Sequence, residues 1–255
     1  MTSDRENSPR LVVVGGGVAG CMGGIYCARA GFDTIIVDGD ASILRRNAHL
    51  ENVPGFPAGV NSRTFLSLLR QQANRSGVHF EEGLVSQVAQ SSDEFDIHIE
   101  SSPAPIQSEY VLLTSWADTS YLSSLPVDLI DRGSKTYIDV DQFGRTGIDG
   151  LYAAGRIAEK PHQTVVAAGH GAEVALTIID DSPVPFYHDW VAPSGYFTQR
   201  GRDVPPGVEE ITESERRRRE RESMKVMQDA FEKPHPDEPT MHPSVIAKRD
   251  DSSED

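Results

Sequence analysis

Three glycines and one aspartate carry the clearest chemical signal in this sequence. Gly15, Gly17 and Gly20 follow the apolar run at residues 11–14, and Asp38 stands 23 positions after the first of them. Where a strand, a glycine turn and a helix follow one another in this way, the backbone can approach a pyrophosphate closely. An acidic residue at the end of the next strand accepts hydrogen bonds from a ribose. The spacing therefore predicts a dinucleotide site, and the Asp38 carboxylate disfavours NADP because it would repel a 2'-phosphate.

A second turn of the same kind lies within residues 151–170, LYAAGRIAEKPHQTVVAAGH. It places Gly155 and Arg156 after an apolar strand, and a helix begins near Gln163 and Thr164. The amino terminus of that helix would direct N–H groups and a positive dipole at the electron-rich end of a ligand. We expect the two turns to hold opposite ends of one ligand.

Histidines supply the candidates for proton transfer. His162 lies beside the second turn, and His49 is the other candidate for a catalytic proton donor. None of the eight histidines has the spacing of a metal ligand relative to acidic or cysteine partners, so no metal is expected. The two cysteines, Cys21 and Cys27, fall about 240° apart around one expected helix, so we interpret them as packing residues rather than as a disulfide.

The charge balance excludes some classes of partner. Acidic residues outnumber basic residues by 39 to 24, and the basic set consists of nineteen arginines and five lysines. Such a surface repels nucleic acids and anionic lipids. No segment has the pattern of a signal peptide or of a membrane span, so we expect a cytoplasmic protein without nucleic-acid or membrane partners. The composition fits either a halophilic protein from a cytoplasm with high salt or an ordinary acidic protein.

Apolar periodicity places the two turns in an α/β fold. The expected strands are 11–14, 34–37, 78–81, 84–88, 95–99, 110–114, 137–140 and 151–154, and the expected helices are 18–30, 62–76, 163–179 and 213–232. We interpret the strands at 78–81, 84–88 and 95–99 as a small antiparallel meander. The pattern predicts a Rossmann-like domain with a parallel sheet, helices on both faces and this meander.

The chain is expected to divide into one domain and two flanking segments. These are a flexible N-terminus at residues 1–9, a ligand-binding domain at 10–182 and a C-terminal extension at 183–255. The extension opens with VPFYHDWVAPSGYF, which is too apolar for a free tail and is expected to cover the bound ligand. It ends in an acidic segment that we expect to be disordered.

A charged helix is expected within the extension, near residues 213–232, with Thr212 as its cap. Its arginine-rich run, ERRRRERE, is interleaved with glutamates, which favours solvated i,i+4 ion pairs over a nucleic-acid site. Met224, Met227 and Phe231 form an apolar stripe that would dock on the domain or on a second subunit.

Several longer segments resemble one family of flavoproteins. They are GGGVAGCMGGIYCARAGF, ENVPGFPAGV at 51–60, and YIDVDQFGRTGIDGLYAAG at 137–155 followed by KPHQTVVAAGHGAEVAL. In this order they resemble the FAD domain of the thioredoxin reductase family over about residues 9–182. The resemblance implies that the first turn holds the FAD pyrophosphate, that Asn52 lies beside the flavin, and that the second turn holds the ribityl chain and the ring. The cofactor-binding residues that we expect are Gly15, Gly17, Val18, Ala19, Gly20, Asp38, Gly39, Leu44, Asn47, Asn52, Val85, Thr114, Trp116, Gly155, Arg156, His162, Gln163 and Thr164.

The chain departs from that family in three respects. Where the family carries an inserted NADPH domain, only about residues 115–136 lie between two strands, so that domain is expected to be absent. The Cys-x-x-Cys pair of that domain is absent too, which excludes thiol–disulfide exchange through it. Arg156 stands where the family usually has an aspartate that accepts ribityl hydrogen bonds, which a guanidinium cannot do. Trp116 stands where the resembled family has a glycine-bearing turn near the FAD ribose, and it would cover the adenosine or fill the gap left by the missing domain.

Together these patterns predict an FAD-binding oxidoreductase that passes electrons between a separate donor and an acceptor. The donor is expected to be NAD(P)H or a ferredoxin-like protein, the acceptor is not identified by the sequence, and the resemblance allows a homodimer. Two alternatives stay open: a non-catalytic module of this fold that binds a dinucleotide or a partner, and an enzyme that binds NAD in the first turn.

Overall fold

The computed structural model of the chain describes residues 8–40, 42–100, 102–242 and 244–245. Residues 1–7 of the expected flexible N-terminus and residues 246–255 of the expected disordered end lie outside the described residues. The helices are α1 (Val18–Ala30), α2 (Ser62–Arg75), α3 (Thr164–Asp181) and α4 (Glu213–Phe231), with 3-10 turns η2 (Ile43–Arg46), η3 (Ser120–Leu122), η4 (Gly155–Ala158) and η5 (Thr198–Arg200). The strands are β1 (Arg10–Val14), β2 (Asp33–Asp38), β3 (His79–Glu82), β4 (Val85–Ser91), β5 (Glu94–Ile99), β6 (Ile106–Ser108), β7 (Tyr110–Leu113), β8 (Leu129–Asp131), β9 (Thr136–Ile138), β10 (Leu151–Ala153), β11 (Trp190–Pro193) and β12 (Val208–Ile211).

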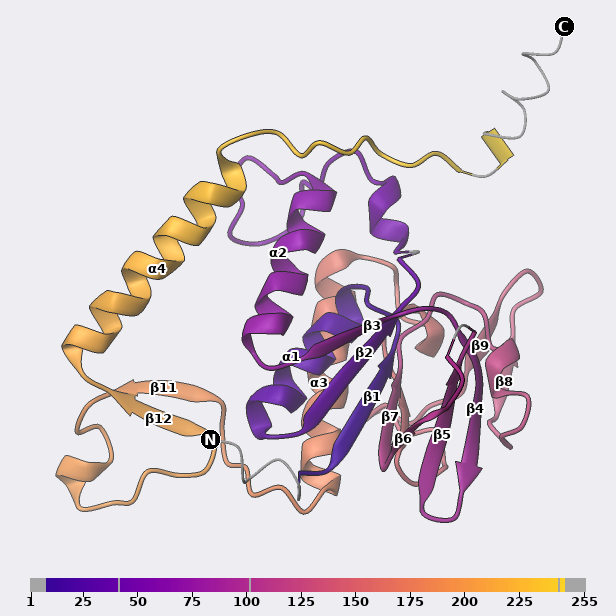
Figure 1. Cartoon of the computed structure of the whole chain (residues 1–255), viewed down its shortest axis with the longest axis horizontal. Coiled ribbons are helices and arrows are strands. Elements are labelled where there is room, and N and C mark those ends of the chain that lie inside the picture. The colour runs from indigo at the N-terminus through magenta and orange to yellow at the C-terminus, as the bar shows by residue number, and fades with distance from the viewer. Residues whose placement is uncertain (1–7, 41, 101, 243, 246–255) are drawn as a thin grey trace, which may run out of the picture.

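A five-stranded parallel sheet in the order β10-β7-β1-β2-β3 forms the centre of the molecule (Figure 1). Its middle strand, β1, is apolar without interruption because both of its faces are covered, and its residues 11–14 are buried. The α/β class and the parallel sheet predicted from the sequence are confirmed.

The sheet separates two apolar clusters. On one face, Leu11 and Val13 pack with residues of α1, α2 and α3, and on the other, Val12 and Val14 pack with the antiparallel sheet β4-β5-β6. The α-helices of the domain thus cover one face. On the second face, residues of the short 3-10 turns η3 and η4 pack in the cluster beside the alternating apolar residues of β5.

Two further details differ from the sequence-based expectations. The strand near residues 78–81 does not belong to the meander, since β3 pairs in parallel with β2 and forms the edge of the main sheet. The third strand of the meander is β6, a three-residue strand too short to be recognised by alternation. Residues 115–136 contain η3 and β8, and β8 pairs with β9 in an antiparallel hairpin.

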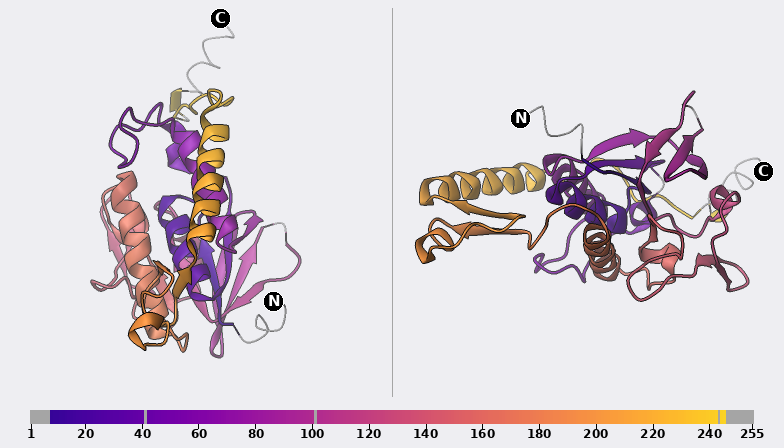
Figure 2. Two further views of the ribbon diagram at one scale, coloured as in Figure 1. Left: turned by 90° about the vertical axis from the view of Figure 1, so that its left-hand side faces the viewer. Right: turned by 90° about the horizontal axis from the view of Figure 1, so that it is seen from below.

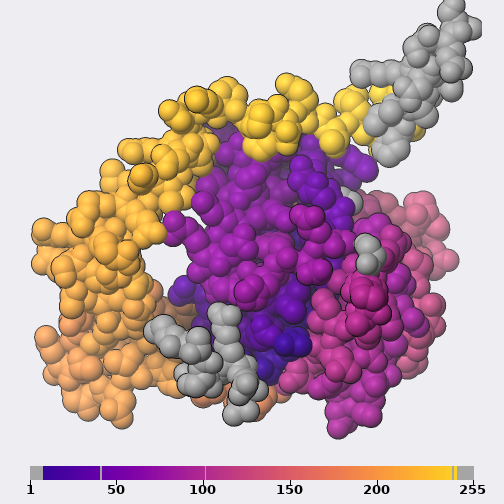
Figure 3. Space-filling view, in the orientation of Figure 1, coloured from indigo at the N-terminus to yellow at the C-terminus, as the bar shows by residue number. Residues whose placement is uncertain are grey.

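The C-terminal extension forms an arm beside the domain (Figures 1 and 2). Strands β11 and β12 pair in parallel, and α4 runs along the outside of the molecule without a buried residue (Figure 3). The Thr212 cap is confirmed, because its hydroxyl accepts a hydrogen bond from the Glu215 N–H at 3.2 Å. The expected i,i+4 ion pairs along the helix are present, for example between Arg218 and Glu222.

The apolar stripe on α4 reaches the domain only at its end. The rings of Phe231 and Phe56 lie 6.2 Å apart, whereas Met224 remains 61% exposed. An ion pair of Arg75 on α2 with Glu222 on α4 adds a second contact. The arm therefore touches the domain through a few side chains rather than through a packed face.

Candidate functional site

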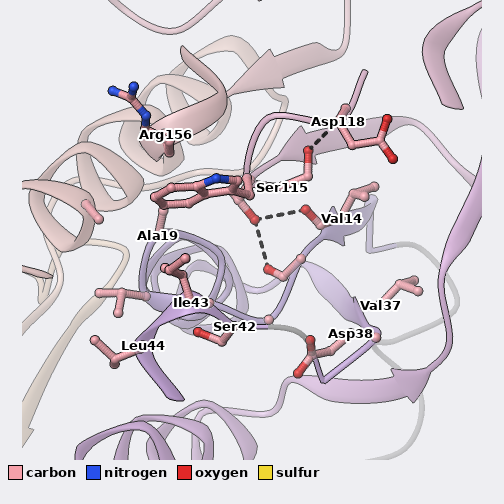
Figure 4. Close-up of a pocket in the computed structure, with 18 of the residues that line it drawn as sticks. Val14, Ala19, Val37, Asp38, Ser42, Ile43, Leu44, Ser115, Asp118 and Arg156 are labelled. Atoms are coloured by element: carbon pink, nitrogen blue, oxygen red, sulfur yellow. Dashed lines mark hydrogen bonds between the residues drawn. The ribbon is translucent and has the colours of Figure 1, made fainter. Parts of the chain in front are cut away.

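A single elongated cleft joins the two turns at the carboxyl ends of the central strands (Figure 4). It encloses about 1270 Å³ of space, including its open mouth. Its walls come from the residues that follow β1, β2, β3 and β7 and from the amino ends of α1 and α3. In a parallel sheet this edge, where neighbouring connections run to opposite sides, is where ligands bind.

The first turn offers donors to an anion. Gly17 is the N-cap of α1 and has no side chain to satisfy the helix amino terminus, so the first N–H groups of α1 remain available at the cleft. Gly20 lies behind the turn, where a side chain would overlap the Gly15 carbonyl oxygen. Thr114, after β7, donates its hydroxyl to the Val14 and Gly15 carbonyls at 3.0 and 2.8 Å and fixes the turn against the sheet.

Asp38 marks one end of the cleft, and an arginine holds it. Its side chain is 8% exposed, forms an ion pair with Arg70 of α2 and accepts a hydrogen bond from the Asp40 N–H at 3.1 Å. Arg70 also stacks on the Phe80 ring at 4.4 Å. Because the guanidinium balances the carboxylate, Asp38 repels a 2'-phosphate less than the sequence alone suggests.

Arg156 marks the other end and is held between two aromatic rings. Its guanidinium lies 4.6 Å from the centre of the Tyr137 ring and 6.0 Å from that of Trp116. It donates hydrogen bonds to the Tyr137 hydroxyl and to the Lys160 carbonyl, while its buried Nε has no partner among the described residues. Trp116 lies at the start of the 115–136 segment and Tyr137 directly follows the segment, so Arg156 of the second turn contacts both of its ends.

The same end collects further groups around Trp116. The His162 ring lies 5.5 Å from the indole in an edge-to-face contact, and Lys135 Nζ lies 5.1 Å from it. Gln163 is the N-cap of α3, has no capping hydrogen bond of its own, and accepts a hydrogen bond from Asn52 Nδ2 at 2.9 Å. The structure therefore brings Asn52 to the amino terminus of α3, as the sequence suggests.

A buried histidine that no sequence motif marks supports the second turn. The Gly155 N–H donates to His170 Nδ1 at 3.0 Å, and His170 is 6% exposed. Burial lowers the pKa of His170, and nearby Lys160 lowers it further, against a smaller opposing effect of Glu173. A neutral ring is required, because only an unprotonated Nδ1 can accept this hydrogen bond.

This arrangement predicts a pH-dependent stability. The folded pKa of His170 lies below its ordinary value of 6.5, so unfolded chains bind more protons and the free energy of unfolding should fall as the pH drops below that value. Asparagine places an oxygen near Nδ1 but does not titrate, so His170→Asn should flatten the dependence between about pH 5 and about pH 7.5. Denaturant unfolding across this range measures the pH dependence of the free energy of unfolding, with His79→Asn at an exposed position as the control. An unchanged slope in His170→Asn would contradict the assignment.

Most of the expected cofactor-binding residues line the cleft. Those that do are Gly15, Gly17, Val18, Ala19, Asp38, Gly39, Leu44, Val85, Thr114, Trp116, Arg156, His162, Gln163 and Thr164. Gly20, Asn47, Asn52 and Gly155 do not line it. His49 does not line it either, and its Nδ1 lies 2.8 Å from the Glu51 carboxylate.

Sequence reasoning missed part of the wall. The additional lining residues include Gly16, Ser42, Ile43, Leu84, Ser115, Asp118 and Tyr121. Ser115 and Asp118 are joined by a hydrogen bond from the serine hydroxyl to the aspartate carbonyl (Figure 4). No described residue of the C-terminal extension lines the cleft, so the expectation that the aromatic segment covers the ligand is wrong. That segment is tied to the opposite end of α1, where Arg29 donates two hydrogen bonds to the Asp189 carboxylate.

The cysteines have no redox-active geometry. Both are buried with free thiols, and burial raises the pKa of Cys21 to about 12 and that of Cys27 still further. A thiol that does not ionise is a poor nucleophile, which confirms that both are packing residues. Within the described ranges, no group of three His, Cys, Asp or Glu side chains could hold a metal ion. None of the described helices is long and apolar enough to cross a membrane.

Relatives and solved structures agree with this architecture. A thioredoxin reductase of Dictyostelium discoideum is 26% identical over 120 residues, which cover 44% of this chain and 38% of the relative. One of Aquifex aeolicus is 32% identical over 88 residues, covering 32% and 26%. The chain thus spans well under half the length of these curated relatives. The fold matches a thioredoxin reductase structure from Gloeobacter violaceus with a TM-score of 0.63 and 17% identity, covering 71% of this chain and 99% of that chain.

The match to a family is broader than the match to any of these relatives. Residues 3–171 correspond to the family described as pyridine nucleotide-disulphide oxidoreductase. FAD is the cofactor of its thioredoxin reductase-like members. Because the match covers well over half of the sequence, the chain belongs to the pyridine nucleotide-disulphide oxidoreductase family.

Proposed function

We propose that this protein is a flavin-dependent oxidoreductase that binds FAD along the cleft and passes electrons between a separate donor and an acceptor. The observation that carries the proposal is the single cleft with the amino ends of α1 and α3 in its wall. Each amino terminus offers unpaired N–H groups to negative charge. FAD has a pyrophosphate in its middle and an electron-accepting ring at one end. One helix amino terminus would therefore bind the pyrophosphate, and the other would lie at the ring.

The residues present fit FAD from one end of the cleft to the other. Asp38 would accept hydrogen bonds from the adenosine ribose, and Leu84 and Val85 would contact the adenine. The N–H groups after Gly17 would bind the pyrophosphate. The amino terminus of α3, with Gln163 oriented by Asn52, would lie at the ring end. Bound flavin would supply the electron-accepting chemistry, and the protein would supply orientation and electrostatics.

Electron transfer in this proposal does not use a dithiol of this chain. Cys21 and Cys27 are buried with raised pKa values, and only residues 115–136 lie where the resembled family carries an inserted NADPH domain. A donor, NAD(P)H or a ferredoxin-like protein, would therefore have to deliver electrons from outside. Trp116, His162 and Lys135 at the ring end are the side chains that such a donor or an acceptor would meet first.

A second candidate is a module that binds a dinucleotide without turnover. It is favoured by the Arg156 contact with Tyr137 and Trp116, which occupies the place of the ribityl-binding aspartate of the resembled family. In that case the first turn would bind the adenosine diphosphate half of FAD or NAD, and the ring end would make few contacts.

The absorbance spectrum of the purified protein, before and after incubation with FAD, separates the two candidates. A bound flavin spectrum that dithionite bleaches supports the oxidoreductase, and stopped-flow reduction by NADH, NADPH or reduced ferredoxin then identifies the donor. A colourless protein that takes up no FAD would refute it, and binding of NAD without FAD would support the module.

Arg156→Asp tests the ring end directly. A carboxylate there would accept ribityl hydrogen bonds, each worth about 1.5–3 kcal/mol, so FAD affinity should rise about tenfold or more. Fluorescence titration with FAD measures the change, and Arg221→Asp, on the exposed face of α4, adds the same charge as a control. Equal or weaker FAD binding by Arg156→Asp would mean that the arginine itself supports the bound cofactor.

A further inference from the structure

A second pocket lies in the C-terminal extension, beyond the residues that match the family. It encloses about 740 Å³ of space, including its open mouth. Four aromatic side chains and two arginines form most of its wall: Tyr187, Trp190, Tyr196, Phe197, Arg200 and Arg202. This pocket is separate from the cleft proposed to bind FAD, because the two share no lining residue.

One carboxylate organises the loop that carries this wall. Glu210 of β12 accepts hydrogen bonds from the Gly195, Phe197 and Thr198 N–H groups at 2.8, 2.5 and 3.1 Å, and from the Thr198 hydroxyl at 2.9 Å. Burial opposes ionisation of Glu210, but these hydrogen bonds outweigh it and hold the pKa at about 2. The carboxylate is therefore ionised at neutral pH and fixes the conformation of the loop that carries Tyr196 and Phe197.

The rings of the aromatic wall contact one another, yet part of the wall is exposed to solvent. Trp190 contacts Tyr196 edge to face at 4.6 Å and Phe197 at 5.9 Å. Tyr187 and Tyr196 nevertheless remain 68% and 43% exposed. Exposed aromatic surface beside a cavity is suited to stacking with a planar ligand.

Two arginines give the pocket its positive charge. Arg200 lies 4.5 Å from the centre of the Tyr196 ring and donates to the Tyr196 carbonyl, and among the described residues neither it nor Arg202 forms an ion pair. Two nearby carboxylates are engaged elsewhere, since Asp189 pairs with Arg29 and Glu210 is held by the loop. No described aspartate or glutamate lines the pocket, and Asp203, which follows Arg202 in the sequence, is not part of its wall. In a chain of net charge −15, two arginines in a wall without a carboxylate point to an anionic ligand.

We propose that this pocket binds a planar ligand that carries an anionic group, of the mononucleotide class. Its ring system would stack on the aromatic wall, and its phosphate would be bound by Arg200 and Arg202. A long nucleic acid is disfavoured as the ligand, because the protein as a whole is strongly acidic and would repel a polyanion. A single nucleotide would be attracted by Arg200 and Arg202, and it would be repelled less by the acidic surface because it carries fewer charges than a polyanion.

The two tryptophans of the chain allow the pocket to be observed alone. Trp116 lies in the flavin cleft and Trp190 in the second pocket, so Trp116→Phe leaves Trp190 as the sole reporter. This full-length variant is titrated with adenosine monophosphate, adenosine or inorganic phosphate. The same titrations are repeated with Arg200→Gln and Arg202→Gln added, and with Arg221→Gln as a matched control on α4.

The expected result is a saturable change in Trp190 fluorescence with adenosine monophosphate. Adenosine and phosphate alone should bind at least about tenfold more weakly, as should adenosine monophosphate to either arginine variant, since a charge-assisted hydrogen bond contributes about 1.5–3 kcal/mol. Circular dichroism of the arginine variants establishes whether the fold is retained. The proposal is overturned if Trp190 does not respond, if folded arginine variants bind adenosine monophosphate as tightly as the parent, or if adenosine binds as tightly as the nucleotide.

Discussion

Gly171→Ala should lower the free energy of unfolding by about 1–3 kcal/mol or more. A methyl group at position 171 would overlap the backbone carbonyl oxygen of Ala19. Backbone atoms cannot move aside as the end of a flexible side chain can, so α3 and α1 would have to separate. These two helices carry the two turns at their amino ends, and their separation would therefore disturb both ends of the cleft.

The same helix provides a matched control. Gly169 lies two positions earlier on α3, is exposed, and has no atom within 4 Å of the position a methyl group would take. Gly169→Ala should therefore stabilise the protein by about 0.5–1 kcal/mol, because alanine favours a helix over glycine. Denaturant unfolding of both variants, with and without FAD, provides the comparison. Equal stability of Gly171→Ala and Gly169→Ala would show that α1 and α3 are not packed as closely as the structure indicates.

Local sequence signals gave the parts of the fold that depend on a few neighbouring residues. Helix α1 has the bounds that the glycine turn and Gly31 predict, and the Thr212 cap and the ion pairs of α4 follow from spacing alone. The first turn and Asp38 also lie together at the cleft, as their order in a strand-turn-helix-strand unit requires.

The remainder depends on contacts between distant residues. The sequence of β3 gives no means of telling an edge strand of the main sheet from a strand of the meander, because both are short and half exposed. Arg70 is separated from Asp38 by 32 positions, and His170 from Gly155 by 15, so neither pairing has a local pattern. The position of the C-terminal arm has no local pattern either, because its aromatic composition indicates that it packs but not on which surface.

Gly17→Ala should separate cofactor binding from folding. Gly17 has φ −77° and ψ −168°, a conformation that alanine adopts without strain. The nearest described atom to the added methyl group is Ser42 Oγ at 3.9 Å, and both residues line the cleft. The methyl group would therefore enter the space next to the free N–H groups of α1, where the pyrophosphate is proposed to bind, and would leave the packing of the domain intact.

The expected outcome is a protein with unchanged unfolding but weaker FAD binding. Displacing the phosphates by the width of a methyl group should cost one or two charge-assisted hydrogen bonds of about 1.5–3 kcal/mol each, or about tenfold to ten-thousandfold in affinity. Fluorescence titration with FAD and denaturant unfolding of the apoprotein measure the two quantities, with Gly169→Ala as the control for adding a methyl group elsewhere. Unchanged FAD affinity in a folded Gly17→Ala protein would mean that the pyrophosphate does not lie on the first turn. Since the first turn, Asp38 and the amino terminus of α1 are then left without their proposed ligand, that result would count against the whole orientation of FAD in the cleft.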